Sequence, residues 1–285
     1  MFGFSAVHEG ARRLLVFPLA FFVICAAINS RAAALHAGEL TVGGTGAALG
    51  TMRLLLDAYT KSHPKMSVKV PPSLGSSGGI KAVLAGAIIL AVSSRPPRKK
   101  ERAAGAIATM YATTAIVPVV GPGNPLTGIT SSELLALYQG KPMYWADGTN
   151  VRLVLRRKGE IDVKILKQHI PEIGMALDRL RVNPAIPVVF SDQENAAAIE
   201  RMSGGFGFVA LSLLRSEKRR LKAIALDGVA ADPKTIADGS YPLRKPFYFV
   251  VKGKPGPQVR DFIAFVRSPR GADLLRRTGH APALD

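Results

Sequence analysis

The stretch PPSLGSSGGIKAVLAG, residues 71–86, joins a loop of prolines, serines and glycines to the start of a helix. Ile80, Val83, Leu84 and Ala87 follow the loop with the i, i+3, i+4, i+7 spacing of one helix face. A serine is a good helix N-cap, and glycines let a bound group approach the free N–H groups of the first turn. The pattern therefore predicts either a capped helix after a tight turn or an anion site at the helix start.

Ser76 or Ser77 is the residue expected to cap this helix. The surrounding segments alternate between strands, at residues 39–42, 66–70 and 88–92, and helices, one of which follows the loop GGTGAALG. The strand at 88–92 is apolar at every position, as in a sheet covered on both faces. This alternation predicts an α/β fold with mainly parallel sheets.

The second half of the chain carries explicit start signals for two helices. Residues 130–133, TSSE, and residues 191–194, SDQE, both fit the capping box and precede apolar residues. Strands are expected at residues 151–155 and 206–211, and in the segment KPFYFVVKGKPGP, before a closing amphipathic helix.

The first 37 residues have the order of a secretory signal peptide. Two arginines precede an apolar run at residues 14–28, and small residues offer a cleavage site after Ala34 or Ala37. The sequence thus predicts export to the periplasm, with an uncleaved membrane anchor as the alternative. Cys25, the only cysteine, lies in this segment, so the mature chain has no disulfide, thiol nucleophile or cysteine metal site.

The net charge of +18 indicates a surface that attracts anions. The basic clusters at residues 95–102, 156–158 and 215–222 are short and lack the interleaved aromatic residues of a nucleic-acid module. No nucleic-acid partner, cofactor or metal site is expected, because the histidines are scattered and no acidic cluster has ligand spacing.

The motif GSSGG at residues 75–79 also fits the G-x-S-x-G pattern of a serine hydrolase. A hydrolase needs a histidine partner, for which the mature chain offers His169 and His280. A nucleotide-binding P-loop fits less well, because Lys81 follows an isoleucine and precedes an alanine.

Three loops rich in glycine or serine, at residues 43–48, 75–79 and 93–97, are expected at the carboxyl ends of parallel strands, where open α/β sheets bind ligands. Arg156, at the end of another strand, adds a fixed positive charge. Hydroxyls, helix-terminal N–H groups and one arginine suit an oxyanion, and no general base accompanies them. The pattern favours a binding protein over an enzyme.

Several segments resemble periplasmic phosphate-binding proteins of ABC importers. LTVGGTGA, PSLGSSGGIKAVLAGAI and AVSSRP resemble the first lobe of those proteins, and VVGPGNPLTGITSSELLALYQGK resembles the entry to the second lobe. GGFGFVALSLL and the segment from KPFYFVV to the C-terminus resemble the later part of the second lobe and the return to the first. The resemblance implies the two-lobed type II periplasmic-binding-protein fold, with hinge strands and a ligand cleft. Lobe 1 would comprise residues 38–115 and 246–285, and lobe 2 residues 116–245.

The resemblance also implies the ligand-binding residues. N–H groups of the first loop, residues at the start of the helix that follows the second loop, and Arg156 would hold phosphate or a related oxyanion. The loop residues are Thr45, Gly46, Ala47 and Ala48, and the residues at the helix start are Ser76, Ser77 and Gly78. Ser94 stands where the family has an aspartate that accepts the proton of hydrogen phosphate. Residues 160–163 read EIDV in place of the family's Ser-Gly-Thr turn, so Asp162 or Glu160 could supply the missing carboxylate.

The resemblance implies two protein partners at the inner membrane, an ABC permease and its ATPase. The binding protein would be a monomer and would deliver phosphate or a related oxyanion to them. Because the family's aspartate and hydroxyls are replaced, a surface-interaction module that has lost its ligand is the other alternative, beside the hydrolase.

Overall fold

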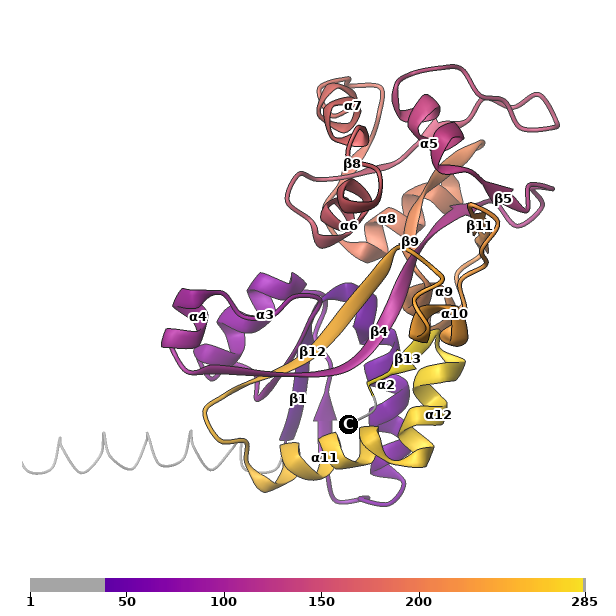
Figure 1. The fold of residues 1–285 in the computed structure, drawn as a ribbon. Helices are drawn as coiled ribbons and strands as arrows, with labels where there is room; N and C mark the ends of the chain where they lie inside the picture. Colours follow the sequence, from indigo (N-terminus) through magenta and orange to yellow (C-terminus); the bar gives the residue numbers. More distant parts are fainter. Residues whose placement is uncertain (1–38, 284–285) are drawn as a thin grey trace, which may run out of the picture. The chain divides into compact units, whose positions relative to one another are not determined.

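Two long strands, β4 (Ala106–Val120) and β12 (Arg244–Lys252), run side by side and antiparallel, and the other elements are arranged along them (Figure 1). The computed structural model describes residues 39–283, and residues 40–283 belong to one compact unit. The predicted signal peptide lies outside the described residues. Within residues 39–283, no helix combines the length and the apolar character needed to cross a membrane.

The main sheet has the strand order β2-β1-β3-β12-β4-β9-β6, and β10 and β13 also pair with β4. Its remaining strands are β1 (Glu39–Gly44), β2 (Ser67–Lys69), β3 (Leu90–Ser93), β6 (Arg152–Leu153), β9 (Gly205–Ala210), β10 (Lys222–Ala223) and β13 (His280–Pro282). β1 pairs with β3, and β6 with β9, in parallel, as the alternating pattern predicted. The pairs made by β12 and β4 are antiparallel. These two strands therefore join the two parallel parts of the sheet.

Two short parallel ladders complete the strands. β5 (Gly128–Ile129) pairs with β11 (Ala225–Leu226), and β7 (Leu155–Arg156) pairs with β8 (Val188–Val189). The domain boundaries expected at residues 115–116 and 245–246 fall inside β4 and β12, and the division itself stays a prediction.

The helices form two groups at the two ends of β4 and β12 (Figure 1). The group beside β1 and β3 contains α2 (Gly46–Thr60), α3 (Gly75–Leu84), α4 (Lys99–Ala103), α11 (Pro257–Arg267) and α12 (Pro269–Arg277). The group at the other end contains α5 (Ser131–Tyr138), α6 (Ile161–His169), α7 (Ile173–Leu180) and α8 (Asp192–Arg201). α9 (Leu211–Ser216) and α10 (Pro233–Ala237) lie near the middle.

Both predicted capping boxes are confirmed. The hydroxyl of Thr130 accepts a hydrogen bond from the N–H of Glu133 at the start of α5, and Ser191 does the same for Glu194 at the start of α8. Such a bond satisfies one of the N–H groups that the first helical turn leaves without an intrahelical partner.

Two other helix starts differ from the prediction. α3 begins at Gly75 after Leu74, so Ser76 and Ser77 lie in its first turn and neither is the N-cap. α2 begins at Gly46, inside the segment that was expected to be a loop. Glycine and alanine suit both a loop and a close contact, and here α2 starts with a row of buried residues. Tertiary packing therefore explains why α2 begins at Gly46, earlier than the sequence predicted.

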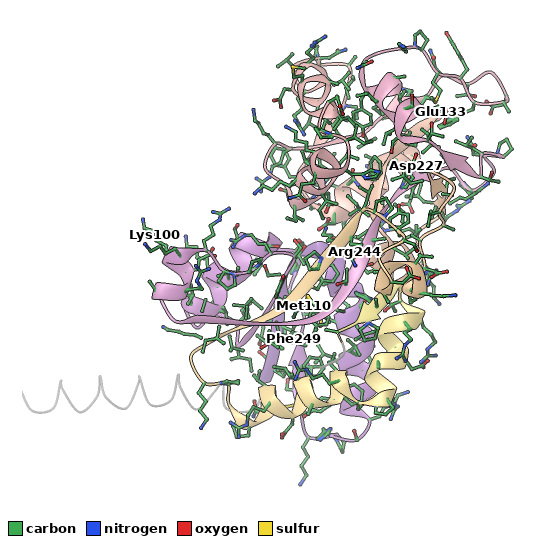
Figure 2. The ribbon with its side chains drawn as sticks, in the orientation of Figure 1. Lys100, Met110, Glu133, Asp227, Arg244 and Phe249 are labelled. Atoms are coloured by element: carbon green, nitrogen blue, oxygen red, sulfur yellow. The ribbon has the colours of Figure 1, made fainter. Side chains whose placement is uncertain are left out.

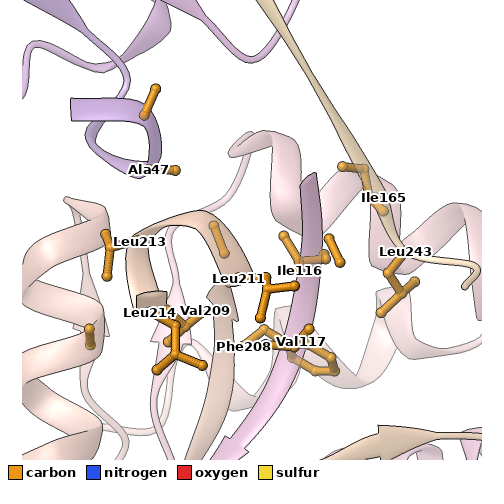
Figure 3. Packing of buried hydrophobic residues seen from close by; sticks show 14 of the residues in the cluster. Ala47, Ile116, Val117, Ile165, Phe208, Val209, Leu211, Leu213, Leu214 and Leu243 are labelled. Atoms are coloured by element: carbon orange, nitrogen blue, oxygen red, sulfur yellow. The ribbon is translucent and has the colours of Figure 1, made fainter. Parts of the chain in front are cut away.

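The hydrophobic core packs around β4 and the strands paired with it. Figure 3 shows Ile116 and Val117 of β4 beside Phe208 of β9 and Leu211 of α9, all of them buried. Further along β4, the ring of Tyr111 stacks on Phe249 of β12 with a centroid distance of 4.1 Å. Figure 2 shows the contrast at the surface, where Lys100 on α4 points away from the fold.

Gly44 is the last residue of β1 and allows the first loop to turn toward α2. Its φ of 140° lies in a region open essentially only to glycine. A Cβ there would overlap the carbonyl oxygen of Val92 on β3, which accepts a hydrogen bond from the N–H of Thr45 at 3.0 Å. Gly79 of α3 packs against the Cα of Gly44, where a Cβ on Gly79 would lie at 2.7 Å.

We expect Gly44→Ala to lower the free energy of unfolding by about 2–4 kcal/mol, because it adds backbone strain to a steric overlap. Urea denaturation measures the loss. Gly121→Ala is the control, since Gly121 has no positive φ and a Cβ there meets nothing within 4 Å; its effect should stay within about 0.5 kcal/mol. Equal effects of the two substitutions would contradict the role of Gly44.

Candidate functional site

A cavity of about 400 Å³ opens where the loops after β1, β3 and β7 meet the start of α8. Seven basic and two acidic residues line it, together with serines, glycines and Phe190. The basic residues are Arg95, Arg98, Arg156, Arg157, Lys158, Lys164 and Lys245, and the acidic ones are Glu160 and Asp192. The surplus of positive charge suits an anionic ligand.

The start of α2 contributes Thr45 to the wall of the cavity, whereas Gly46, Ala47 and Ala48 do not line it. The N–H group of Thr45 donates to Val92, and that of Ala48 donates to the carbonyl of Thr45. The N–H group of Ala47 donates to Oδ2 of Asp192 at 3.0 Å. Three of the four N–H groups predicted to hold an anion are therefore bonded within the protein.

The start of α3 brings the predicted serines together at the cavity. Ser76, Ser77, Gly78 and Ser94 all line it. Oγ of Ser76 accepts the N–H of Ser94 at 3.0 Å and lies 2.9 Å from Oγ of Ser94. This pair of hydroxyls ties α3 to the loop after β3 and turns polar groups toward the cavity.

Arg95 fixes the neighbouring rim of the cavity. Its guanidinium makes two hydrogen bonds of 2.7 Å to the carboxylate of Glu101 and donates to Oγ of Ser77 at 3.0 Å. The hydrogen bond from Arg95 is the main reason why the pKa of Glu101 is lowered to about 2. Arg95 is thereby held beside α3 as a fixed cation.

Arg156 lies at the end of β7, as predicted, and its side chain is 7% exposed. Its Nη1 donates to the carbonyl of Ser191. Its Nη2 lies 3.6 Å from Oδ1 of Asp192 and 3.7 Å from Oε2 of Glu160. Its Nε is buried without a hydrogen-bond partner among the described residues. The arginine is thus a buried cation that already faces two carboxylates.

Lys245 of β12 is a second buried cation, 1% exposed, that the sequence analysis did not identify. Its Nζ lies 2.7 Å from Oδ1 of Asp162 and 3.6 Å from Oδ1 of Asp192. Burial lowers the pKa of this ammonium, but the two carboxylates outweigh burial, and the pKa is raised. Lys245 therefore stays charged at the wall of the cavity.

Asp192 is the second residue that the sequence analysis missed. Burial raises the pKa of its carboxyl group. Lys245, Arg156 and the N–H of Ala47 lower that pKa by more than burial raises it, so the net shift is downward. In the sequence, Asp192 lies inside a capping box, where an acidic residue in the first turn of a helix is common and does not indicate a ligand site. Asp162, which was predicted to face the ligand, is buried beside Lys245 and is not among the residues that line the cavity.

The two histidines required by the hydrolase alternative do not contact the serines of α3. Nε2 of His169 lies 3.1 Å from Oγ of Ser131 and 3.4 Å from Asp227, which Figure 2 shows near Glu133 of α5. His280 is buried, with Nδ1 3.2 Å from the hydroxyl of Thr278. Among the described residues, the hydroxyl of Ser76 has hydrogen-bond contacts with Ser94 and none with a histidine.

Several curated proteins align with most of the chain. A phosphate-binding protein PstS from Bacillus subtilis is 21% identical over 258 residues, which cover 87% of this chain and 82% of that protein. Protein SphX from Synechococcus elongatus is 26% identical over 266 residues, which cover 85% of this chain and 77% of that protein.

A solved structure with the same fold comes from Clostridium perfringens and contains bound phosphate. It superimposes with a TM-score of 0.71 at 20% identity and covers 86% of this chain and 100% of the other. This likeness confirms the expected α/β fold of type II periplasmic binding proteins. A family model, the PBP superfamily domain, matches residues 29–270, which is more than half of the chain, and the protein therefore belongs to that family.

Proposed function

We propose that this protein is an exported solute-binding protein that captures phosphate or a related oxyanion for an ABC importer. The observation that carries the proposal is the cavity of about 400 Å³ where α3, the start of α2 and two buried cations meet. Fixed donors and charged side chains are the groups that bind oxyanions strongly in a site that excludes water. The cavity is larger than a single phosphate ion needs, so a bound ion would share it with water or draw the walls inward.

The curated relatives support this choice of ligand. The Bacillus subtilis relative is named as a phosphate-binding protein, and the Clostridium perfringens structure holds phosphate. Delivery to a permease and an ATPase at the inner membrane follows from the resemblance to ABC-importer binding proteins. Periplasmic location rests on the signal pattern in residues 1–37.

A non-enzymatic role agrees with the contacts of the serines. Ser76 bonds to Ser94, and Ser77 accepts from Arg95, so within residues 39–283 neither hydroxyl is paired with a base. One observation favours a surface-interaction module as a second candidate: Asp192 and Glu160 already face Arg156. Isothermal titration calorimetry separates the two roles, because a module of this kind would bind none of phosphate, sulfate and molybdate.

We expect Arg156→Ala to weaken phosphate binding by about 30-fold or more, equivalent to about 2 kcal/mol. The reason is that a buried, fixed guanidinium gains a charge-assisted contact with the anion that water cannot replace. Calorimetric titration of the full chain with phosphate measures the change.

The control for this experiment is Arg179→Ala, because Arg179 is exposed on α7 and does not line the cavity. Arg98, which the sequence alone would suggest as a control, lies at the cavity and is unsuitable. Similar losses for Arg156→Ala and Arg179→Ala would mean that general surface charge, and no defined site, attracts phosphate.

Ser94 is expected to limit the discrimination between phosphate and sulfate. A carboxylate at this position would accept the proton of hydrogen phosphate and repel sulfate, whereas a hydroxyl donates to either anion. We expect the wild-type preference for phosphate to stay below about 1,000-fold, or about 4 kcal/mol. Ser94→Asp should raise the preference by about tenfold or more in competition calorimetry.

Ser94→Asn provides the matched comparison, since asparagine has the size of aspartate without its charge. It should leave the phosphate preference at the wild-type level or below. A wild-type preference above about 1,000-fold would refute the relaxed site and direct attention to Glu160 and Asp192, the carboxylates that line the cavity.

A further inference from the structure

Asp192 stands where the donors of the candidate site converge. Its Oδ2 accepts the N–H of Ala47 at 3.0 Å, and its Oδ1 lies 3.6 Å from both Arg156 and Lys245. A helix-start N–H group and two cations are the partners that an oxyanion would take. The carboxylate is therefore placed as a bound anion would be, although it belongs to the chain itself.

We infer that Asp192 acts as an internal anion that holds the N–H of Ala47 at the start of α2 together with Arg156 and Lys245, and that an oxyanion must displace it in order to bind. The inference rests on the proposed function and adds a regulatory element to it. Asp192 thereby lowers the affinity for the ligand, and it joins α8 to α2 through the N–H of Ala47.

Asp192 and the residue after it both bond to the start of α2, and we call these contacts between α8 and α2 the latch. The adjacent Gln193 donates to the carbonyl of Gly46 at 3.0 Å and to Glu217 at 2.8 Å. Gly46 makes this approach possible, because a Cβ there would overlap Oε1 of Gln193 and lie 2.9 Å from Oδ2 of Asp192. A glycine at the first position of α2 thus admits two side chains of α8.

The charges around the latch oppose the simple addition of an anion. Arg156 and Lys245 face the carboxylates of Asp162, Asp192 and Glu160, so the buried cations are already compensated. A dianion placed beside an ionised Asp192 would meet repulsion at close range in a poorly solvated site. If Asp192 moves away, the anion inherits Arg156, Lys245 and the N–H of Ala47.

Displacement has a quantitative consequence. A protein whose binding-competent state is a minor population shows an affinity reduced by that fraction. Substitutions that remove the internal carboxylate make the competent state the major one. We therefore expect Asp192→Asn and Asp192→Ala to bind inorganic phosphate at least about tenfold tighter than the wild type, as measured by calorimetry on the full chain.

Glu160→Gln is the matched control. Oε2 of Glu160 lies 3.7 Å from Nη2 of Arg156, nearly the same distance as Oδ1 of Asp192, but among the described residues Glu160 makes no hydrogen bond to α2. Relief of charge at Arg156 alone would change the two sites alike. We expect Glu160→Gln to raise the phosphate affinity by no more than about threefold; an equal effect at both sites would overturn the inference.

Hydrogen exchange of the ligand-free protein tests the latch without any ligand. The N–H of Ala47 lies in the first turn of α2, where no intrahelical acceptor is available, and Asp192 is its acceptor. In Asp192→Ala this amide should exchange at least about tenfold faster than in the wild type, and added phosphate should slow it again.

The two measurements separate the possible failures. Faster exchange together with tighter phosphate binding supports the internal anion. Unchanged exchange in Asp192→Ala, or weaker phosphate binding in both variants that fold, overturns it and leaves the proposed function intact. If wild type and variants all fail to bind phosphate, sulfate and molybdate, the proposed function fails, and the competition that the inference requires fails with it.

Discussion

The cavity depends on the ion pairs that the buried ammonium of Lys245 makes with two aspartates. A charge that is 1% exposed requires compensation, and it is supplied by Asp162 of α6 and Asp192 of α8. Both aspartates lie in the first turn of their helices, where the helix dipole also favours a negative charge. One lysine on β12 therefore holds the starts of two helices against the strand and orients the side of the cavity opposite α3.

This network of ion pairs fixes the relative positions of the helices and adds little to the free energy of unfolding. Removing one partner of a buried ion pair is costly, whereas the intact pair gains little over apolar residues of the same size. Arg156 and Glu160 extend the network toward the cavity, and the N–H of Ala47 extends it to α2. Segments far apart in the sequence are thus placed relative to one another by a few charged atoms.

The sequence predicted what depends on neighbouring residues. The capping boxes at Thr130 and Ser191 were identified because their donors and acceptors lie three residues apart. Arg156 was found because a basic residue followed a clear strand. The start of α2 and the roles of Asp192 and Lys245 were missed, because they arise from contacts such as Ala47 to Asp192, which lie 145 residues apart. No local pattern records a partner at that separation.

Charge acts in two ways around this cavity. The net charge of +18 and the exposed cations at the rim, among them Lys158, attract anions over several ångströms, and salt weakens that attraction. Inside, carboxylates already face Arg156 and Lys245, so an anion that enters the proposed site would compete with them at short range. Under the proposed function, attraction at the rim would control how fast an anion arrives, while the buried carboxylates would control whether it stays. The residues that set the overall field of the protein are thus, under the proposed function, different from the buried residues that an anion would finally contact.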